Sequence, residues 1–106
     1  MREVHVNFPN EAEADLAALG AVERRLAAGA NIHPPIRSHY WWNGAVQSEQ
    51  EVPVVFKTSD HGVDALVDYL AGQHSYQTPG IVVHKPVEAH APYAAWIDRE
   101  TRTATP

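Results

Sequence analysis

The sequence contains no cysteine, which excludes disulfide bonds, thiolate metal ligands and cysteine nucleophiles. No apolar run approaches the roughly 20 residues that a membrane-spanning helix needs, and residues 1–6 lack the long apolar region of a secretory signal. Positive charge is also scarce, with 8 Lys and Arg residues against 13 Asp and Glu residues and a formal net charge of -5. We therefore expect no membrane or nucleic-acid partner, and a location in the cytoplasm.

The residues that are present fit one soluble globular domain over positions 1–106. Hydrophobic residues make up 44% of the chain and charged residues 20%, as in proteins that bury a core. Histidine, the commonest metal ligand, is frequent. It occurs at His5, His33, His39, His61, His74, His84 and His90. No pair has the His-x-x-x-His or Glu-x-x-His spacing of helical metal sites, so surface and strand-edge histidines are the simpler interpretation.

Apolar and polar residues alternate over 4–8, which predicts a half-buried strand. Asn10, followed by a glutamate three residues later, predicts the start of an alanine-rich helix that runs to about residue 28. Gly29 is expected to end this helix in the left-handed conformation, and Gly20 inside it predicts a closely packed neighbour. The stripe expected to face the core consists of Leu16, Leu19, Val22 and Leu26.

The middle of the chain predicts a β-hairpin. Residues 30–42 resemble a strand interrupted at Pro34-Pro35, where neither residue can donate to a sheet. Asn43-Gly44 is a strong turn signal, and a second strand is expected over 49–58. Pro53 inside that strand predicts an edge position or a bulge.

The last part of the chain predicts a helix, a strand and a further helix. Ser59 or Asp60 is expected to cap the first of these helices, and Gly72 to close it. Residues 80–84 form a short apolar run, typical of a strand buried on both faces. Pro92 opens the last helix. The apolar residues of the helix after Ser59 have helical spacing, at Val63, Leu66, Val67 and Leu70. The polar tail 101–106 is expected to fray.

The predicted order is strand, helix, strand, strand, helix, strand and an extra helix. Two strand–helix–strand units joined by a hairpin predict an α+β fold of the ferredoxin-like, split βαβ type, with an antiparallel sheet and two helices on one face. This fold hosts many unrelated activities, so it does not by itself indicate a function.

Five motifs in order resemble those of the CutA (divalent cation tolerance) family. They are RLAAGANI at 25–32, SHYWWNG at 38–44, EQEV through FKT at 49–58, HSYQTP at 74–79 and PYAAWI at 92–97. The resemblance covers residues 4–99. It implies a homotrimer of ferredoxin-like subunits, whose sheets meet through the long middle strands. It also implies a link to copper or other divalent-ion tolerance, without an established enzymatic activity.

The sequence departs from the family pattern where other members carry potential metal ligands. Gly29 replaces the family's usual cysteine, Gln77 replaces a glutamate, and Gly80 replaces an acidic residue. Cysteine is the soft ligand that copper prefers, and carboxylates bind harder cations. Metal binding by an inherited cleft is therefore less supported here than in a typical member.

His74 is the candidate metal residue. The resemblance places its loop, through Tyr76, in the cleft between subunits, where a neutral imidazole would bind Cu²⁺ or Zn²⁺ together with groups of a neighbouring subunit. The alternative is a structural histidine that caps the loop after Gly72 or bonds a backbone carbonyl. No cofactor is required by either interpretation.

The aromatic run Tyr40, Trp41 and Trp42 is a candidate for a subunit interface or a ligand cleft. On a strand, Tyr40 and Trp42 point to one face and Trp41 to the other, so one face must bury its ring elsewhere or expose it. An interface is the favoured interpretation because interfaces are enriched in Trp and Tyr.

Two further residues are candidates for the same interface or cleft. Lys57, with Arg37, would bind an anionic small molecule or be paired with nearby carboxylates. Trp96, at helical spacing from Tyr93, is expected to anchor the core or the interface.

Three functions remain in view. The leading one is a non-enzymatic trimer linked to divalent-metal homeostasis, and the second is a sensor that binds a small molecule in the inter-subunit clefts. An enzyme with His74 as general base is disfavoured, because no partner group that would position such a base is evident in the sequence.

Overall fold

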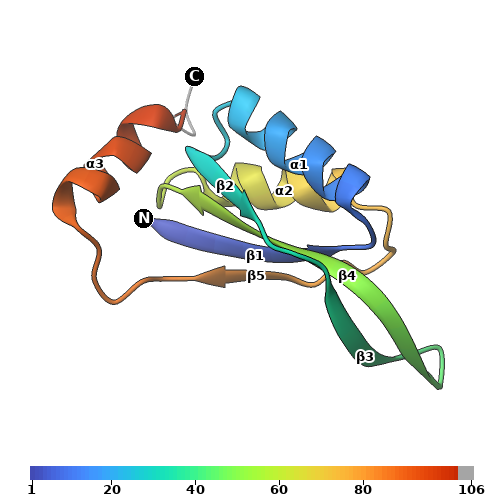
Figure 1. Cartoon of the computed structure of the whole chain (residues 1–106). Coiled ribbons are helices and arrows are strands. Elements are labelled where there is room, and N and C mark those ends of the chain that lie inside the picture. The colour runs from blue at the N-terminus through green and yellow to red at the C-terminus, as the bar shows by residue number, and fades with distance from the viewer. Residues whose placement is uncertain (103–106) are drawn as a thin grey trace.

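The computed structural model describes residues 1–102. Its elements are β1 (Arg2–Phe8), α1 (Glu11–Glu23), β2 (Gly29–Ile32), β3 (Ile36–Trp42), β4 (Ala45–Thr58), α2 (Val63–Gln73), β5 (Ile81–His84) and α3 (Ala91–Glu100). The antiparallel sheet has the order β2-β4-β1-β5, and β3 pairs with β4. Figure 1 shows α1 and α2 side by side on one face of this sheet, with α3 at one end. The predicted α+β, split βαβ fold with an extra terminal helix is confirmed.

The core lies between the sheet and the helices α1 and α2. Val4, Val6 and Phe8 of β1 are buried, whereas the residues between them face away from the helices. Phe56 from β4 and Leu66 from α2 are fully buried against the same cluster. The predicted alternation of β1 is therefore correct, and it defines an open sheet face that carries the polar residues.

The helix α1 begins as predicted and ends earlier. Asn10 accepts a hydrogen bond from the backbone N–H of Glu13 at 2.8 Å, which is the expected amino-terminal cap. The predicted end at residue 28 is wrong. The chain leaves the helix at Arg25, which has φ 58°, and Gly29 instead begins β2.

The stripe predicted to face the core from α1 is wrong in its first half. Leu16 and Leu19 are 68% and 61% exposed. The helix buries small side chains instead, at Ala14, Ala17, Ala18 and Ala21. These four residues also follow helical spacing, and their size lets α1 approach the sheet and α2 closely.

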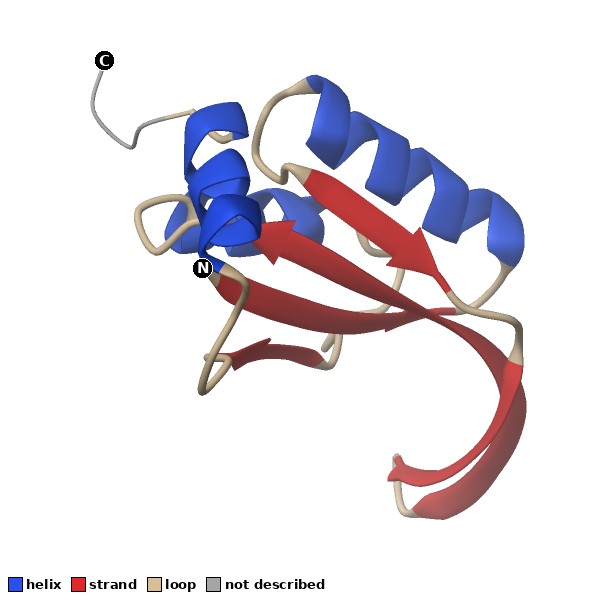
Figure 2. Ribbon diagram, turned by 60° about the vertical axis from the view of Figure 1, so that its left-hand side comes forward, coloured by secondary structure: helices blue, strands red, loops and turns tan. Residues whose placement is uncertain are grey.

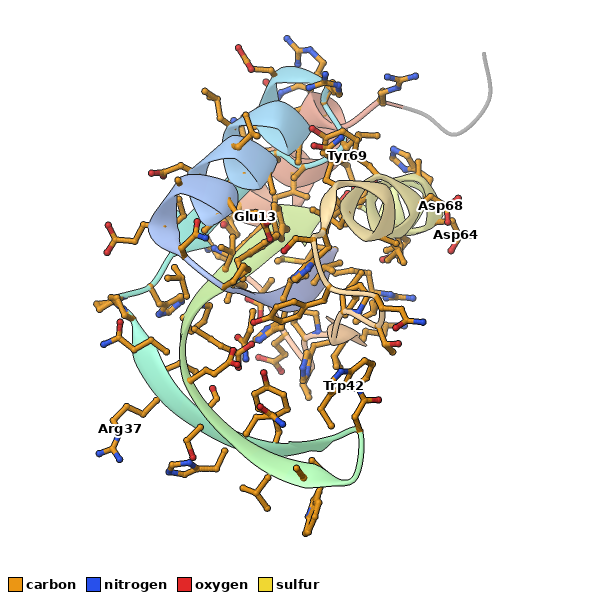
Figure 3. All side chains as sticks on the ribbon, turned by 90° about the vertical axis from the view of Figure 1, so that its right-hand side faces the viewer. Glu13, Arg37, Trp42, Asp64, Asp68 and Tyr69 are labelled. Atoms are coloured by element: carbon orange, nitrogen blue, oxygen red, sulfur yellow. The ribbon has the colours of Figure 1, made fainter. Side chains whose placement is uncertain are left out.

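Gly20 marks the close approach that its position predicts. The hydroxyl of Tyr69 on α2 occupies the space that a side chain at Gly20 would need. The Tyr69 ring also packs against the Arg24 guanidinium, 5.1 Å from the ring centroid. Figure 3 shows Tyr69 where the two helices meet.

The β3–β4 hairpin is longer than predicted and extends beyond the rest of the sheet. Asn43 and Gly44 form its turn with φ values of 51° and 77°, as the sequence predicts. The prediction for Pro53 is wrong, because β4 lies between β1 and β2. The Pro53 carbonyl accepts a hydrogen bond from the backbone N–H of His33, the residue just after β2. The Pro53 nitrogen, which carries no hydrogen, faces this same side, where the pairing of β2 with β4 has already ended, so no strand hydrogen bond is lost.

The second helix starts later than predicted. The residue before α2 is Gly62, with no side-chain cap, and the chain makes a turn in which the Gly62 N–H donates to the Ser59 carbonyl. Asp60 instead pairs with the amino terminus at 3.4 Å and with Arg2 at 3.0 Å. Gly72 does not close the helix, which continues to Gln73.

The strand β5 is not buried on both faces as predicted. It pairs with β1 at the end of the sheet order, and Val82 and Val83 are 53% and 41% exposed. The last helix opens at Pro92 as predicted, and Ile97 is its buried residue. Thr101 and Arg102, which the sequence assigned to the tail, are hydrogen-bonded to the chain, and residues 103–106 lie outside the described residues.

Candidate functional cleft

A cleft of about 760 Å³ lies between the β3–β4 hairpin and the loop that joins α2 to β5. The hairpin side of the lining is Ser38, His39, Tyr40, Trp41, Trp42, Glu49 and Glu51, and the opposite side is Asn7, Ser75, Tyr76, Gln77, Thr78 and Gly80. Figure 2 shows the hairpin curling away from the sheet, and in Figure 3 Trp42 lies inside this curve while Arg37 points outward.

The hairpin register places aromatic and acidic side chains on one face. Ser38 lies opposite Glu49 and Ile36 opposite Glu51, so the even residues of β3 share a face with the odd residues of β4. Tyr40 and Trp42 therefore point to the same face as the two carboxylates. Trp41 points to the other face beside Val46, and these two side chains are 74% and 58% exposed.

The cleft is acidic. Glu51 is 7% exposed and accepts a hydrogen bond from the Tyr76 hydroxyl at 3.1 Å. Burial and the Glu51 carboxylate hold the pKa of Tyr76 well above its ordinary value, because both disfavour a negative charge on the phenol. Desolvation, followed by the nearby Glu49 carboxylate, raises the pKa of Tyr40 in the same direction.

His74 lies beneath the cleft rather than in its lining. Its ring stacks on Phe8 with centroids 4.7 Å apart and an interplanar angle of 14°. Nε2 lies 2.7 Å from the backbone oxygen of Asn7, and Nδ1 lies 3.1 Å from the backbone N–H of Tyr76. The Tyr76 N–H must donate to Nδ1, so Nε2 carries the proton and donates to Asn7. Both nitrogens are then occupied, and the geometry favours the structural alternative over metal ligation.

The loop after His74 is also tied to α1. The Ser75 hydroxyl donates to Glu13 at 3.1 Å, and the same carboxylate lies 3.8 Å from Nδ1 of His74. These contacts fix the loop that carries Tyr76. Sequence reasoning assigned Glu13 only to the helix cap, and no local pattern indicates that its side chain reaches a loop more than sixty residues away.

The candidate residues do not all gather at the cleft. Tyr40, Trp42 and Tyr76 line it together, whereas Trp41 borders it and points its ring to the other face of the hairpin. Lys57 is on the open sheet face, where its ammonium group donates to the side-chain oxygen of Asn31. Trp96 borders a smaller cleft of about 320 Å³, and its ring stacks on Tyr93.

Glu49 and Glu51 are the cleft residues that sequence reasoning undervalued. In the sequence analysis they were, with Asp60, only the nearby carboxylates that could pair with Lys57 or Arg37, and Lys57 lies elsewhere. The signal that would have found them is their spacing of two residues on β4, which places both carboxylates on the face that Tyr40 of β3 shares. Within residues 1–102, no group of three or more His, Asp and Glu side chains could hold a metal ion.

Comparison with known proteins identifies the family. The family model of the CutA1 divalent ion tolerance protein matches residues 3–100. The chain belongs to this family. It is 32% identical over 99 residues to the chloroplastic protein CutA 1 of Oryza sativa, covering 93% of this chain and 56% of that protein. It is 34% identical over 94 residues to the divalent-cation tolerance protein CutA of Salmonella newport, covering 89% and 82%.

Solved CutA structures share the fold. The Cut A1 protein of Thermus thermophilus superposes with a TM-score of 0.91 at 35% identity, covering 96% of this chain and 100% of that one. A CutA from Nostoc described as PII-like, in apo form, gives a TM-score of 0.91 at 28% identity, with 97% and 99% coverage. The periplasmic CutA of Archaeoglobus fulgidus gives 0.89 at 30% identity, with 94% and 98% coverage.

The comparisons leave the location of this CutA family member open. The rice relative is chloroplastic and the Archaeoglobus protein periplasmic, so the expected cytoplasmic location stays a prediction. This chain spans 56% of the length of the rice and human relatives that it matches. No helix within the described part of the chain is both long enough and apolar enough to cross a membrane.

Proposed function

We propose that this chain is a non-enzymatic, cytoplasmic homotrimer that contributes to divalent-cation tolerance by binding a cation such as Cu²⁺ or Zn²⁺ in the hairpin cleft. The observation that carries the proposal is the charge of the cleft. Its lining contains the carboxylates of Glu49 and Glu51 and, in the described structure, no lysine or arginine. A cleft lined by charge of one sign attracts ions of the other.

Burial of Glu51 supports a cationic occupant. A buried carboxylate is destabilising unless hydrogen bonds or an opposite charge compensate it. The Tyr76 hydroxyl supplies one hydrogen bond from a neutral group, since a phenol is protonated at neutral pH, and it therefore does not offset the carboxylate charge. A bound cation would supply the charge compensation that the chain itself does not place in the cleft.

The donor atoms at the cleft favour a divalent ion that accepts oxygen ligands. The carboxylates of Glu49 and Glu51 and the Gln77 amide are available, whereas the His39 ring points to the other face of the hairpin and the chain has no sulfur ligand of the cysteine type. Such a set suits Zn²⁺ or Cu²⁺ better than the soft Cu⁺ ion. His74 is not needed as a ligand, and its part in this proposal is to hold the loop that carries Tyr76.

The exposed face of the hairpin supports assembly. Trp41 and Val46 form a cross-strand apolar pair on a hairpin that projects beyond the sheet. Burying a tryptophan of this kind against a second copy would stabilise a trimer, since Trp is enriched among residues that dominate interface energy. In sedimentation velocity at low protein concentration, Trp41→Ala should shift the population toward smaller species. An unchanged profile would contradict this part of the proposal.

A small-molecule sensor is the second candidate function. The cleft volume of about 760 Å³ falls within the range of metabolite pockets, and Tyr40, Trp42 and Tyr76 offer more aromatic surface than a metal ion uses. Because the same carboxylates are present, this alternative favours a cationic metabolite. Stacking on the aromatic rings would add a cation–π contribution.

Binding of divalent ions and of small organic amines to the wild type, Glu49→Gln and Glu51→Gln would test these functions. Thermal shift and calorimetry should show saturable binding of one ligand class, weakened in both variants. Lys57→Gln is the matched control, since Lys57 lies outside the cleft. Equal binding by the wild type and both glutamine variants would contradict the cleft proposal. Binding of amines without divalent ions would select the sensor.

A non-enzymatic role fits the hydroxyl and imidazole groups at the hairpin. The His39 ring and the Ser48 hydroxyl are 2.8 Å apart, which resembles a base beside a nucleophile. Both residues are exposed on neighbouring strands, where water is not excluded from the pair. A catalytic pair acts in a preorganised, water-excluded site, and this arrangement does not provide one.

A further inference from the structure

His74 is an enclosed histidine whose two ring nitrogens have different hydrogen-bond partners. Its side chain is 0% exposed. Nε2 donates to the Asn7 carbonyl on β1, and Nδ1 accepts from the backbone N–H of Tyr76, in the loop that joins α2 to β5. A backbone N–H can only donate, so the bond to Tyr76 exists only while Nδ1 carries no proton. The contact between this ring and the loop therefore requires a neutral histidine.

A carboxylate lies beside the nitrogen that would take up a proton. Glu13 of α1 has an oxygen 3.8 Å from Nδ1 of His74. The same oxygen accepts from the Ser75 hydroxyl at 3.1 Å, so Glu13 is already held against the loop. A small movement shortens the distance of 3.8 Å to that of a charge-assisted hydrogen bond. A protonated ring would therefore find a new acceptor in Glu13.

The remaining partners of His74 carry no charge near neutral pH. They come from β1, the loop and α2, and they are the Asn7 carbonyl, the Phe8 ring, the Tyr76 ring and the Leu70 carbonyl. Glu51 of β4 lies one contact further away, because it accepts from the Tyr76 hydroxyl. Among the hydrogen bonds, ion pairs and ring contacts of the described residues, His74 thus meets one charged group, the Glu13 carboxylate.

We propose that His74 is a pH-sensitive switch, which holds the Tyr76 loop on the cleft when the ring is neutral and releases it when the ring is protonated. Protonated Nδ1 is a donor that faces the N–H of Tyr76, so the hydrogen bond between them is lost. Nδ1 then donates to Glu13, and Nε2 keeps its bond to the Asn7 carbonyl. Histidine is the side chain that ordinarily changes charge between about pH 5 and 8, where carboxylates ordinarily stay ionised.

Release of the loop would open the acidic cleft. Tyr76 is held at two points, by its N–H on His74 and by its hydroxyl on Glu51. Loss of the first contact frees the backbone that positions the second, and Glu51, which is 7% exposed, then becomes accessible to water. All of these contacts lie within one chain around an enclosed ring, so the switch does not depend on which outer surfaces an assembly covers. It operates whatever the cleft binds, and therefore stands apart from the proposed function.

NMR titration of the metal-free full chain from about pH 8 to about pH 5 tests the switch. The ring nitrogen shifts of His74 should show the Nε2–H tautomer at the upper end and two protonated nitrogens at the lower end. Over the same pH interval, the protection factor of the Tyr76 amide should fall by about tenfold, as expected for the loss of one hydrogen bond. The protection factor is the proper measure because it removes the intrinsic pH dependence of amide exchange.

Three variants separate the switch from a general effect of acid. Glu13→Gln keeps an acceptor for Ser75 and removes the negative charge, so the transition should move to lower pH. Glu11→Gln changes the same charge in the same first turn of α1, and should leave the transition in place. His74→Asn removes the titrating group and keeps an amide near the position of Nδ1, so Tyr76 protection should no longer depend on pH.

The wild-type titration can overturn the proposal without any variant. Protonation of His74 with no loss of Tyr76 protection would do so, and so would a ring that stays neutral down to about pH 5. Among the variants, a Tyr76 transition at an unchanged pH in a folded His74→Asn protein would also overturn it.

Discussion

Replacing His74 with alanine is expected to destabilise the protein in the complete absence of metal. The side chain makes two hydrogen bonds, to Asn7 and Tyr76, and each contributes roughly 0.5–1.5 kcal/mol. Its stacking on Phe8 contributes about 0.5–1.5 kcal/mol more. The ring is also enclosed, with a side-chain exposure of 0%. The expected loss in the free energy of unfolding is therefore about 2–4 kcal/mol.

Urea unfolding at fixed protein concentration, in buffer with excess chelator, measures this loss. His74→Phe separates its parts, because phenylalanine keeps the stack on Phe8 and loses both hydrogen bonds. It should fall between the wild type and His74→Ala. His61→Ala is the matched control, since that histidine is exposed and its removal should change stability by less than about 0.5 kcal/mol. A loss below about 1 kcal/mol for His74→Ala in chelator would refute the structural assignment.

Three further outcomes are expected. Gly20→Ala should stabilise the protein by about 1 kcal/mol only when Tyr69→Phe has removed the hydroxyl that fills the space, and thermal unfolding of the single and double variants measures the difference. Tyr76→Phe should lower stability by about 1–2 kcal/mol in urea unfolding, because Glu51 loses its hydrogen bond. Burial opposes ionisation of Asp60, but the amino terminus and a nearby arginine lower its pKa below 3.8, so its stabilising contribution is present above that pH and is lost as pH falls below it. Asp60→Asn should flatten this acid dependence by less than about 1 kcal/mol, since the pair is exposed; an unchanged pH profile would contradict it.

The order of elements could be predicted because each local signal agrees with the fold. The alternation in β1, the Asn10 cap and the Asn43-Gly44 turn all act within a few residues of where they occur. The errors arise where tertiary contacts decide. Leu16 and Leu19 are the larger apolar residues of α1, but the close contact at Gly20 selects the alanine side for the interior.

The candidate site was predicted only in part, for a related reason. The aromatic residues of β3 and Tyr76 stand out by type, and the structure brings them to one cleft. The role of His74 depends on a carbonyl and an N–H, and a sequence pattern does not show which backbone groups a side chain will meet. Glu51 was missed because its burial follows from the curl of the hairpin and the position of a distant loop.

The long strand β4 belongs both to the cleft and to the core of the sheet. This strand has 14 residues, and at about 3.3 Å per residue it spans on the order of 45 Å without a loop. One half pairs with β3 and carries the cleft carboxylates, and the other half pairs with β1 and β2 at the centre of the sheet. The hairpin tip is therefore joined by a single backbone, with no intervening loop, to the centre of the sheet.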